Sequence, residues 1–258
     1  MANIAKASPA KRFFVEMLTR DIELQDAILD LLDNCVDGAL RQNQANVPTD
    51  QSKPYAGREA IINFSKDGFT IKDNCGGIPR TVAEEYAFRM GRSDTERDAE
   101  IPTVGMYGIG MKRAIFKIGK ASVVSSQHDA TGFKVDISSA WMEDDSAWGL
   151  PITDENLNFA SDGTEIKVTS LHDPIVHLFS SDKSIFEEEF KKVVTSHYSL
   201  IIEKGFKVIV NGEEIESKEV KLMFDATDNG IKPYLYQGTI NGVKIDLVNW
   251  PTSQLTYR

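Results

Sequence analysis

Apolar residues recur at three- and four-residue spacing through residues 22–41, and this spacing predicts an amphipathic helix. A shorter stretch of the same kind predicts a helix over residues 13–20. The buried stripe expected for the longer helix consists of Leu24, Ile28, Leu31, Cys35 and Ala39.

Short β-rich runs dominate much of the remaining chain. Two of them flank a turn at residues 66–68 and predict a hairpin. Helical spacing returns in three later segments, residues 80–90, the end of the glycine-containing stretch 104–119, and residues 184–202. Further strands are expected at 121–127, 132–138 and 163–171, and two hairpins around Asn211-Gly212 and Asn241-Gly242.

Composition places the chain among globular proteins. It has 258 residues, 41% hydrophobic and 26% charged, with a formal net charge of −10. The acidic balance gives no general attraction to nucleic acid or to an anionic membrane. The N-terminus has no apolar core of a signal peptide, no run is long enough to cross a membrane, and two cysteines form no disulfide framework. We therefore expect a cytoplasmic protein without a membrane partner.

The polar face of the 22–41 helix is unusual. It carries Asp26, Asp30, Asp33, Asn34 and Asp37, and the sequence has no Lys or Arg between residues 20 and 41. Like charges at this spacing repel one another, so the face is either a solvated acidic surface or half of a cation site. Mg²⁺ prefers oxygen ligands and few protein ones, which an Asn carbonyl oxygen and a nearby carboxylate can supply.

The segment "IKDNCGGIP" places Asp73 at the end of an expected strand, before a glycine pair. Glycine lets a backbone approach a ligand closely. A carboxylate here can accept a hydrogen bond from an exocyclic amine such as the 6-amino group of adenine. The plainer interpretation is an ordinary turn.

The segment "GMYGIGMK" places Gly105, Gly108 and Gly110 directly before a helix, where backbone N–H groups and the helix dipole favour an anion. It is not a Walker A motif, because Gly110 is not followed by Lys and then Ser or Thr. It is not a Rossmann fingerprint either, because Arg113 stands at the third glycine position. Lys112 in the first helical turn opposes the dipole unless it serves an anion. The glycines also fit a role in packing alone.

A fourth feature is "SDGTEIKV", in which Thr164 begins a strand after Gly163. Its hydroxyl can hydrogen-bond a ligand edge, although threonine is common at strand starts.

Taken in this order, "DLLDNCVDGA", "DNCGGI", "VGMYGIGMKRA" and "DGTEI" resemble the N box, adenine motif, glycine box and later Thr motif of the GHKL superfamily. That superfamily includes gyrase B, Hsp90, MutL, MORC proteins and histidine kinases. The resemblance covers residues 10–175. It implies an α/β Bergerat-type two-layer sandwich, in which helices cover one face of a mixed, mostly antiparallel sheet, followed by a second, smaller α/β segment.

The resemblance also implies roles for individual residues. Asn34 would hold Mg²⁺, Asp73 would bind the adenine amine with the help of Thr164, and Asp30 would be the general base. Asp37 would fix local geometry, and residues 91–104, including Arg92, would form a lid over ATP. The nucleotide-binding set implied in this way is Asn34, Asp73, Gly77, Ile78, Ser93, Gly105, Met106, Tyr107, Gly108, Ile109, Gly110, Lys112 and Thr164.

Residues 1–175 would thus be an ATP-binding domain, and residues 176–258 the start of a transducer-like domain, as in gyrase B, MutL and MORC relatives. The implied activity is a Mg-ATP-driven conformational switch. Lid closure would drive ATP-dependent homodimerisation through the N-terminal segment and control a DNA or protein effector.

Two residues depart from the family pattern. Asp30 stands where the family has Glu, one methylene longer, and Cys75 replaces the first glycine of the adenine motif. The shorter acid keeps open a second interpretation, a nucleotide-binding or chaperone-like module with little turnover. A protein kinase of the histidine or mitochondrial type is a third, although no segment for autophosphorylation is evident.

Overall fold

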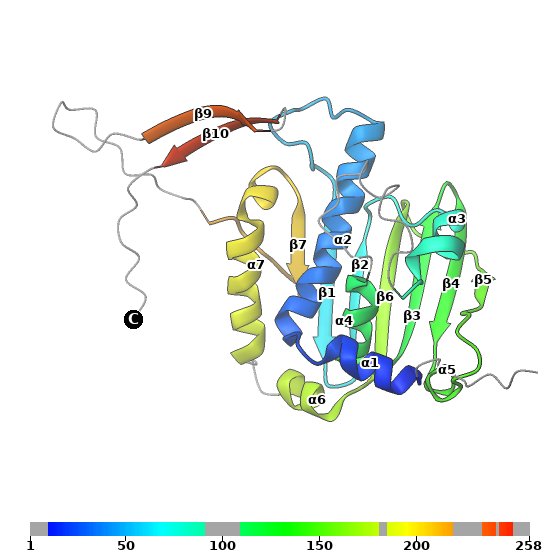
Figure 1. Ribbon diagram of the computed structural model, residues 1–258. Coiled ribbons are helices and arrows are strands. Elements are labelled where there is room, and N and C mark those ends of the chain that lie inside the picture. Colours follow the sequence, from blue (N-terminus) through cyan, green and yellow to red (C-terminus); the bar gives the residue numbers. More distant parts are fainter. Residues whose placement is uncertain (1–9, 91–108, 181–184, 219–233, 241–242, 250–258) are drawn as a thin grey trace, which may run out of the picture. The chain divides into compact units, whose positions relative to one another are not determined.

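The computed structural model describes residues 10–90, 109–180, 185–218, 234–240 and 243–249 (Figure 1). The chain divides into two compact units, Met1–Ser217 and Lys218–Arg258. In the second unit, β9 (Tyr234–Ile240) and β10 (Val243–Asn249) form an antiparallel pair, as the Asn241-Gly242 turn predicted.

The first unit contains the other helices and strands that the structure describes. The helical elements are α1 (Lys11–Thr19), α2 (Leu24–Ala45), α3 (Arg80–Val82), the π-helix η1 (Ala83–Ala87), α4 (Gly110–Ile118), α5 (Ser139–Glu143), α6 (Asp173–Ser180) and α7 (Ile185–Glu203). The strands are β1 (Glu59–Ser65), β2 (Gly68–Asp73), β3 (Gly119–His128), β4 (Thr131–Ile137), β5 (Ile152–Asp154), β6 (Gly163–Leu171), β7 (Lys207–Val210) and β8 (Glu213–Glu214).

These strands form one eight-stranded sheet in the order β5-β4-β3-β6-β2-β1-β7-β8. Neighbouring strands are antiparallel except for β1 and β7, which are parallel. The predicted mixed, mostly antiparallel sheet is therefore confirmed. In β1 and β2 buried positions alternate with more exposed ones, as expected for strands with one packed face.

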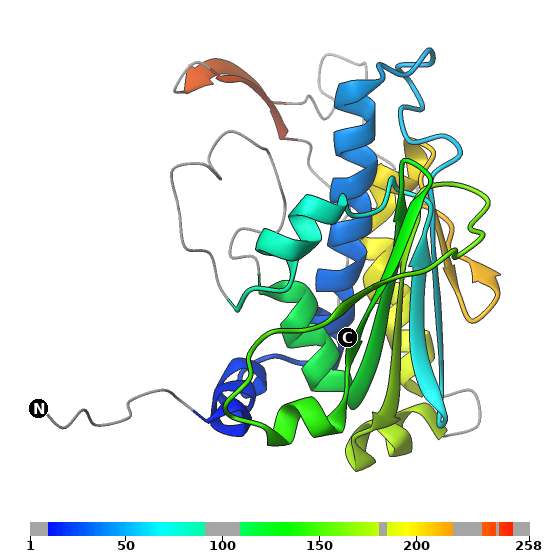
Figure 2. The same ribbon diagram turned by 90° about the vertical axis from the view of Figure 1, so that its right-hand side faces the viewer.

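Helices α1, α2 and α4 lie on one side of the sheet, which Figure 2 shows nearly edge-on. The predicted stripe of α2 is buried throughout, at Leu24, Ile28, Leu31, Cys35 and Ala39. This arrangement confirms the two-layer α/β sandwich. None of the described helices is both long enough and apolar enough to cross a membrane.

The structure adds elements that the sequence pattern did not predict. Helix α2 continues to Ala45, past the expected end at residue 41. Helix α5 follows β4 because Ser138 caps it, accepting a hydrogen bond from the Trp141 N–H, while Trp141 stacks with Phe116 of α4. A five-residue helix defined by a capping serine and one aromatic contact is too short to leave a periodic pattern in the sequence.

Helix α7 and strand β7 belong to the same compact unit as the earlier elements. Strand β7 extends the sheet beside β1, and α7 buries Phe190, Val194 and Tyr198 in the common core. The unit therefore extends past residue 175, where the expected ATP-binding domain ends. The assignment of residues 176–258 to a transducer-like domain stays a prediction.

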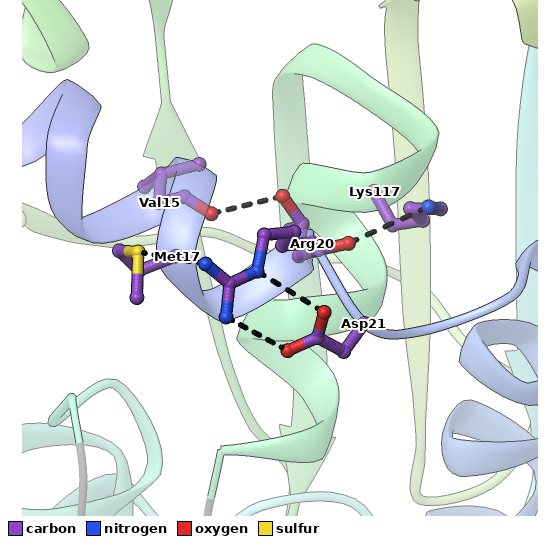
Figure 3. Close-up of polar contacts among 6 residues, drawn as sticks. Val15, Met17, Arg20, Asp21 and Lys117 are labelled. Carbon is purple, nitrogen blue, oxygen red and sulfur yellow. Dashed lines mark hydrogen bonds and ion pairs between the residues drawn. The ribbon is translucent and has the colours of Figure 1, made fainter.

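Local polar contacts lie at the corner between α1 and α2 (Figure 3). Arg20 pairs with Asp21 through two contacts, Nε to Oδ1 at 3.1 Å and Nη2 to Oδ2 at 3.2 Å. Lys117, in the last turn of α4, donates from Nζ to the Thr19 carbonyl oxygen at 3.4 Å. The C-terminal end of α4 is thereby fixed against α1.

Candidate functional site

Helix α2 and helix α4 meet at Asp30. Arg113 of α4 donates from Nη2 to Oδ2 of Asp30 at 2.7 Å, and both side chains are partly exposed. A Cβ placed on Gly110, the first residue of α4, would lie 3.5 Å from Oδ2 of Asp30. The acid expected to be the general base is thus beside the N-terminus of the glycine-box helix. The negative charge of Asp30 is paired with Arg113 of α4, a different helix.

Asn34 lies one turn further along α2 and is exposed. Its Nδ2 donates to the backbone carbonyl oxygen of Asp30 at 2.8 Å, so Oδ1 is the atom that can accept or coordinate. An exposed amide oxygen on the helix that carries the Asp30 carboxylate is a suitable donor set for Mg²⁺, which fills the rest of its shell with water and phosphate oxygens.

Two other acids of α2, Asp33 and Asp37, have different surroundings. Asp33 accepts a hydrogen bond from the Tyr198 hydroxyl of α7 at 2.5 Å, and burial raises its pKa. Asp37 is 4% exposed, which agrees with a role in local geometry. Asp33 and Asp37 are therefore held differently from Asp30, which pairs with Arg113 of α4.

Asp73 ends strand β2, as predicted. Its Oδ1 accepts from the Cys75 N–H at 2.8 Å, and its Oδ2 lies 3.7 Å from the Cys35 thiol of α2. Burial raises the pKa of Asp73 to about 6, while hydrogen bonds from the backbone of Cys75 and Thr164 oppose the shift. A carboxylate held in this way can accept a hydrogen bond from a buried amine.

The loop after Asp73 packs closely against its neighbours. Gly77 has φ +67°, and a Cβ there would lie 2.0 Å from the Gln127 carbonyl oxygen. A Cβ on Gly38 of α2 would lie 2.7 Å from the Cys75 carbonyl oxygen. Cys75 itself is 3% exposed, so its side chain fills space against α2.

Ser126 of β3 joins the adenine-motif loop to the predicted threonine. Its Oγ accepts from the Ile78 N–H at 2.7 Å and lies 3.1 Å from Oγ1 of Thr164. Ser126 is fully buried and Thr164 is 9% exposed. The structure therefore brings Asp73, Ile78 and Thr164 to one end of the sheet.

The glycine box is described only from Ile109 onward. Ser93, Gly105, Met106, Tyr107 and Gly108, with Arg92 and the rest of the expected lid, lie outside the described residues. Ile109 immediately precedes α4, and Gly110 begins it. Lys112 is 2% exposed, and its Nζ donates to the carbonyl oxygen of Ala87, the last residue of η1, at 2.9 Å. In this conformation the Lys112 ammonium contacts a helix end.

Three residues of the site were not predicted as such. Arg113 stood out only as a misfit in the glycine pattern, and Cys35 only as part of an apolar stripe. Ser126 follows Val124 at the two-residue spacing of a strand, so a serine at an inward position was the available signal. Its partners come from distant segments, which spacing along the chain cannot identify.

A family model described as "Histidine kinase-, DNA gyrase B-, and HSP90-like ATPase" matches residues 22–165, more than half of the chain. The match begins just before α2 and ends just after Thr164, so it contains the first three motifs and all of the fourth except Ile166. No curated protein matches the chain.

Proposed function

Because the chain belongs to the family of histidine kinase-, DNA gyrase B- and HSP90-like ATPases, we propose that it binds Mg-ATP, hydrolyses it slowly and uses it as a conformational switch. One relationship carries the proposal. Helix α2 contacts Asp73 through Cys35, the loop after β2 through Gly38, and the start of α4 through Asp30. The expected amine acceptor, Asp73, and the expected anion-binding N-terminus of α4 are therefore both in contact with the same helix, α2.

The adenine would bind at Asp73, whose carboxylate would accept a hydrogen bond from the 6-amino group. Thr164 and the backbone around Gly77 and Ile78 would line the same end. Along α2, Cys35 and Asp30 are five residues apart, about 7–8 Å of helix axis. A nucleotide with its adenine at Asp73 would therefore extend its phosphates toward α4.

The phosphates would lie at the N-terminus of α4, whose first N–H groups and dipole favour anions. Gly105–Gly110 would supply further backbone donors, with Ser93 and Lys112 as side-chain donors. Lys112 would leave Ala87 to do so. Asn34 would hold Mg²⁺, which, when bound, would neutralise phosphate charge.

Asp30 would orient the attacking water and accept its proton. A general base contributes typically about 10²- to 10⁴-fold in rate, and a shorter side chain reaches less well, so we expect slow turnover. The second candidate function, a nucleotide-binding or chaperone-like module with little turnover, is favoured by Asp30 itself, an acid one methylene shorter than the Glu of the family pattern.

The proposed switch also involves movements of three other segments. Residues 91–104 would close over ATP, closure would promote a homodimer through the N-terminal segment, and residues 176–258 would transmit the change to a DNA or protein effector.

Isothermal titration calorimetry with Mg-ATP tests the proposal. We expect saturable binding by the full chain and none by Asp73→Asn. Asp67→Asn, an exposed turn aspartate at the opposite end of β2, is the matched control and should bind normally. Unchanged binding by Asp73→Asn would overturn the adenine assignment. Unchanged turnover in Asp30→Asn would assign the chain to the binding-module alternative.

A further inference from the structure

Arg113 occupies an unfavourable place for a cation if helix stability were its only role. It is the fourth residue of α4, close to the helix N-terminus, where the dipole disfavours positive charge. Its backbone N–H donates to the Ile109 carbonyl oxygen, so the residue is anchored in the first turn. Its side chain extends to α2 and ends on Asp30.

The ion pair adds little to the packing of the two helices. Arg113 and Asp30 are 33% and 27% exposed at their side chains, so water reaches the pair and reduces what it contributes to stability. Helices α2 and α4 are already in contact, and both contribute buried apolar residues to one core, among them Ile28, Leu31 and Ile115. The pair therefore needs another explanation.

Only part of the guanidinium is used. Nη2 donates to Oδ2 of Asp30, while Nε is buried and has no hydrogen-bond partner among the residues that the structure describes. A bidentate pair would engage both carboxylate oxygens. The single contact fixes the direction of the carboxylate and leaves Oδ1 outside the arginine contact.

We propose that Arg113 is a positioning residue: through Oδ2 it holds the short Asp30 carboxylate beside Gly110, and it leaves Oδ1 as the oxygen that accepts the proton. The inference rests on the proposed hydrolysis of ATP. Aspartate reaches one methylene less far than the glutamate of the family pattern, and a fixed direction compensates for part of that loss. Misplacement of a catalytic group by about 1 Å can cost about 100-fold in rate.

A double-mutant cycle tests the role. Arg113→Met keeps the apolar stem but removes the donor, and we expect kcat to fall about 10- to 100-fold. The calorimetric Kd for Mg-ATP should stay within about threefold, because the arginine acts through Asp30 and not on the nucleotide. Arg113→Lys should retain an intermediate kcat, since it keeps one charged donor. In the Asp30→Asn background, Arg113→Met should lower kcat no further.

Arg20→Met is the matched control, because Arg20 also pairs with an aspartate but lies at the α1–α2 corner, away from the site. It should leave kcat and Kd unchanged, and thermal unfolding of each variant should show a folded protein. If Arg113→Met does not fold, Arg113→Lys is compared instead, in the parent protein and in Asp30→Asn.

Three results would overturn the inference. The first is a kcat of Arg113→Met within twofold of the parent value, and the second is an equal fall in kcat when Arg113→Met is added to Asp30→Asn. The third is a fall in turnover that the weaker Kd for Mg-ATP explains entirely. A parent protein that binds Mg-ATP without turnover would also overturn it. Failure of the parent to bind Mg-ATP would instead overturn the proposed function itself, so the two failures are distinguishable.

Discussion

The Tyr198 hydroxyl donates a hydrogen bond to Oδ1 of Asp33 at 2.5 Å and lies 3.3 Å from the Leu29 carbonyl oxygen. The contact joins α7 to α2 across 165 residues of sequence. Burial raises the pKa of both groups, that of the Asp33 carboxyl and that of the Tyr198 hydroxyl, so the tyrosine remains a donor. Helix α7 is thereby attached to the helix that carries Asp30 and Asn34.

Tyr198→Phe should lower the free energy of unfolding by about 1–3 kcal/mol, because the half-buried Asp33 carboxylate loses its donor while the ring still fills its space. Urea unfolding at pH 7 measures the change. Tyr86→Phe, at a tyrosine that is 49% exposed, is the control and should be neutral. Equal stability of Tyr198→Phe and the parent would show that the contact contributes nothing.

The position of α7 also predicts where the chain can be shortened. A protein ending at residue 175 would lose α7 and β7, exposing the faces that pack against Phe190, Val194 and Tyr198. We expect it to aggregate or to unfold without cooperativity, whereas a protein ending at Ser217 should show a cooperative transition. Circular dichroism during heating distinguishes them. A cooperative transition in the shorter protein would support an independent domain of residues 1–175.

Local patterns predicted much of the fold, because helix stripes and hairpin turns are encoded within a few residues. The stripe from Leu24 to Ala39 and the turn at Asn211-Gly212 are examples. The extension of the unit to β7 was not predictable, since a parallel strand joins the sheet through pairing with β1 about 150 residues earlier.

The arrangement of the candidate site could be predicted about as well as the fold. The structure places Asp73, Ile78 and Thr164 together through Ser126, and Asp30 beside Gly110, as the ordered motifs suggested. The Asp30–Arg113 pair could not be predicted, because the two residues lie on different helices and are 83 positions apart in the sequence.

Two buried serines on β3 allow a controlled test of the polar connection to Thr164. Ser126→Ala should cost about 1–3 kcal/mol of unfolding free energy, because the partly buried Ile78 N–H loses its acceptor. It should also weaken Mg-ATP binding, since Thr164 loses a partner.

Ser122→Ala is the control, because the Ser122 Oγ is buried without a hydrogen-bond partner among the described residues. Removing that hydroxyl should be neutral or stabilising. Chemical unfolding and calorimetry on both variants give the comparison. Similar losses in the two variants would contradict the role assigned to Ser126.

Gly38→Ala sets two effects of opposite sign against each other. Alanine favours a helix interior over glycine by about 1 kcal/mol. A Cβ at this position would, however, lie 2.7 Å from a backbone oxygen, that of Cys75, which cannot rotate away. We expect the clash to dominate, lowering the melting temperature and weakening ATP binding by displacing the loop after Asp73.

Gly149→Ala provides the matched control, because a Cβ there meets no atom within 4 Å. It should be neutral or stabilise by up to about 1 kcal/mol. A Gly38→Ala protein more stable than the parent would show that α2 and the loop separate more readily than the structure indicates.

Asp73 should make stability depend on pH. Burial raises its pKa in the folded protein to about 6, above the ordinary value of 3.8. Between pH 4 and pH 6 the folded state therefore binds more protons than the unfolded state, so the contribution of this group to stability falls as the pH rises. Above pH 6 the loss is complete, of the order of 1–3 kcal/mol.

Asp73→Asn cannot ionise, so its stability relative to the parent should rise between pH 4 and pH 6 and stay level to pH 8. Urea unfolding at each pH measures the difference, with Asp67→Asn, exposed beside Lys66, as the control that should show no such rise. The same Asp73→Asn protein should not bind ATP, so stability and binding would change in opposite directions. A difference in unfolding free energy that is constant from pH 4 to pH 8 would contradict the raised pKa, because burial of the carboxylate would then cost nothing on ionisation.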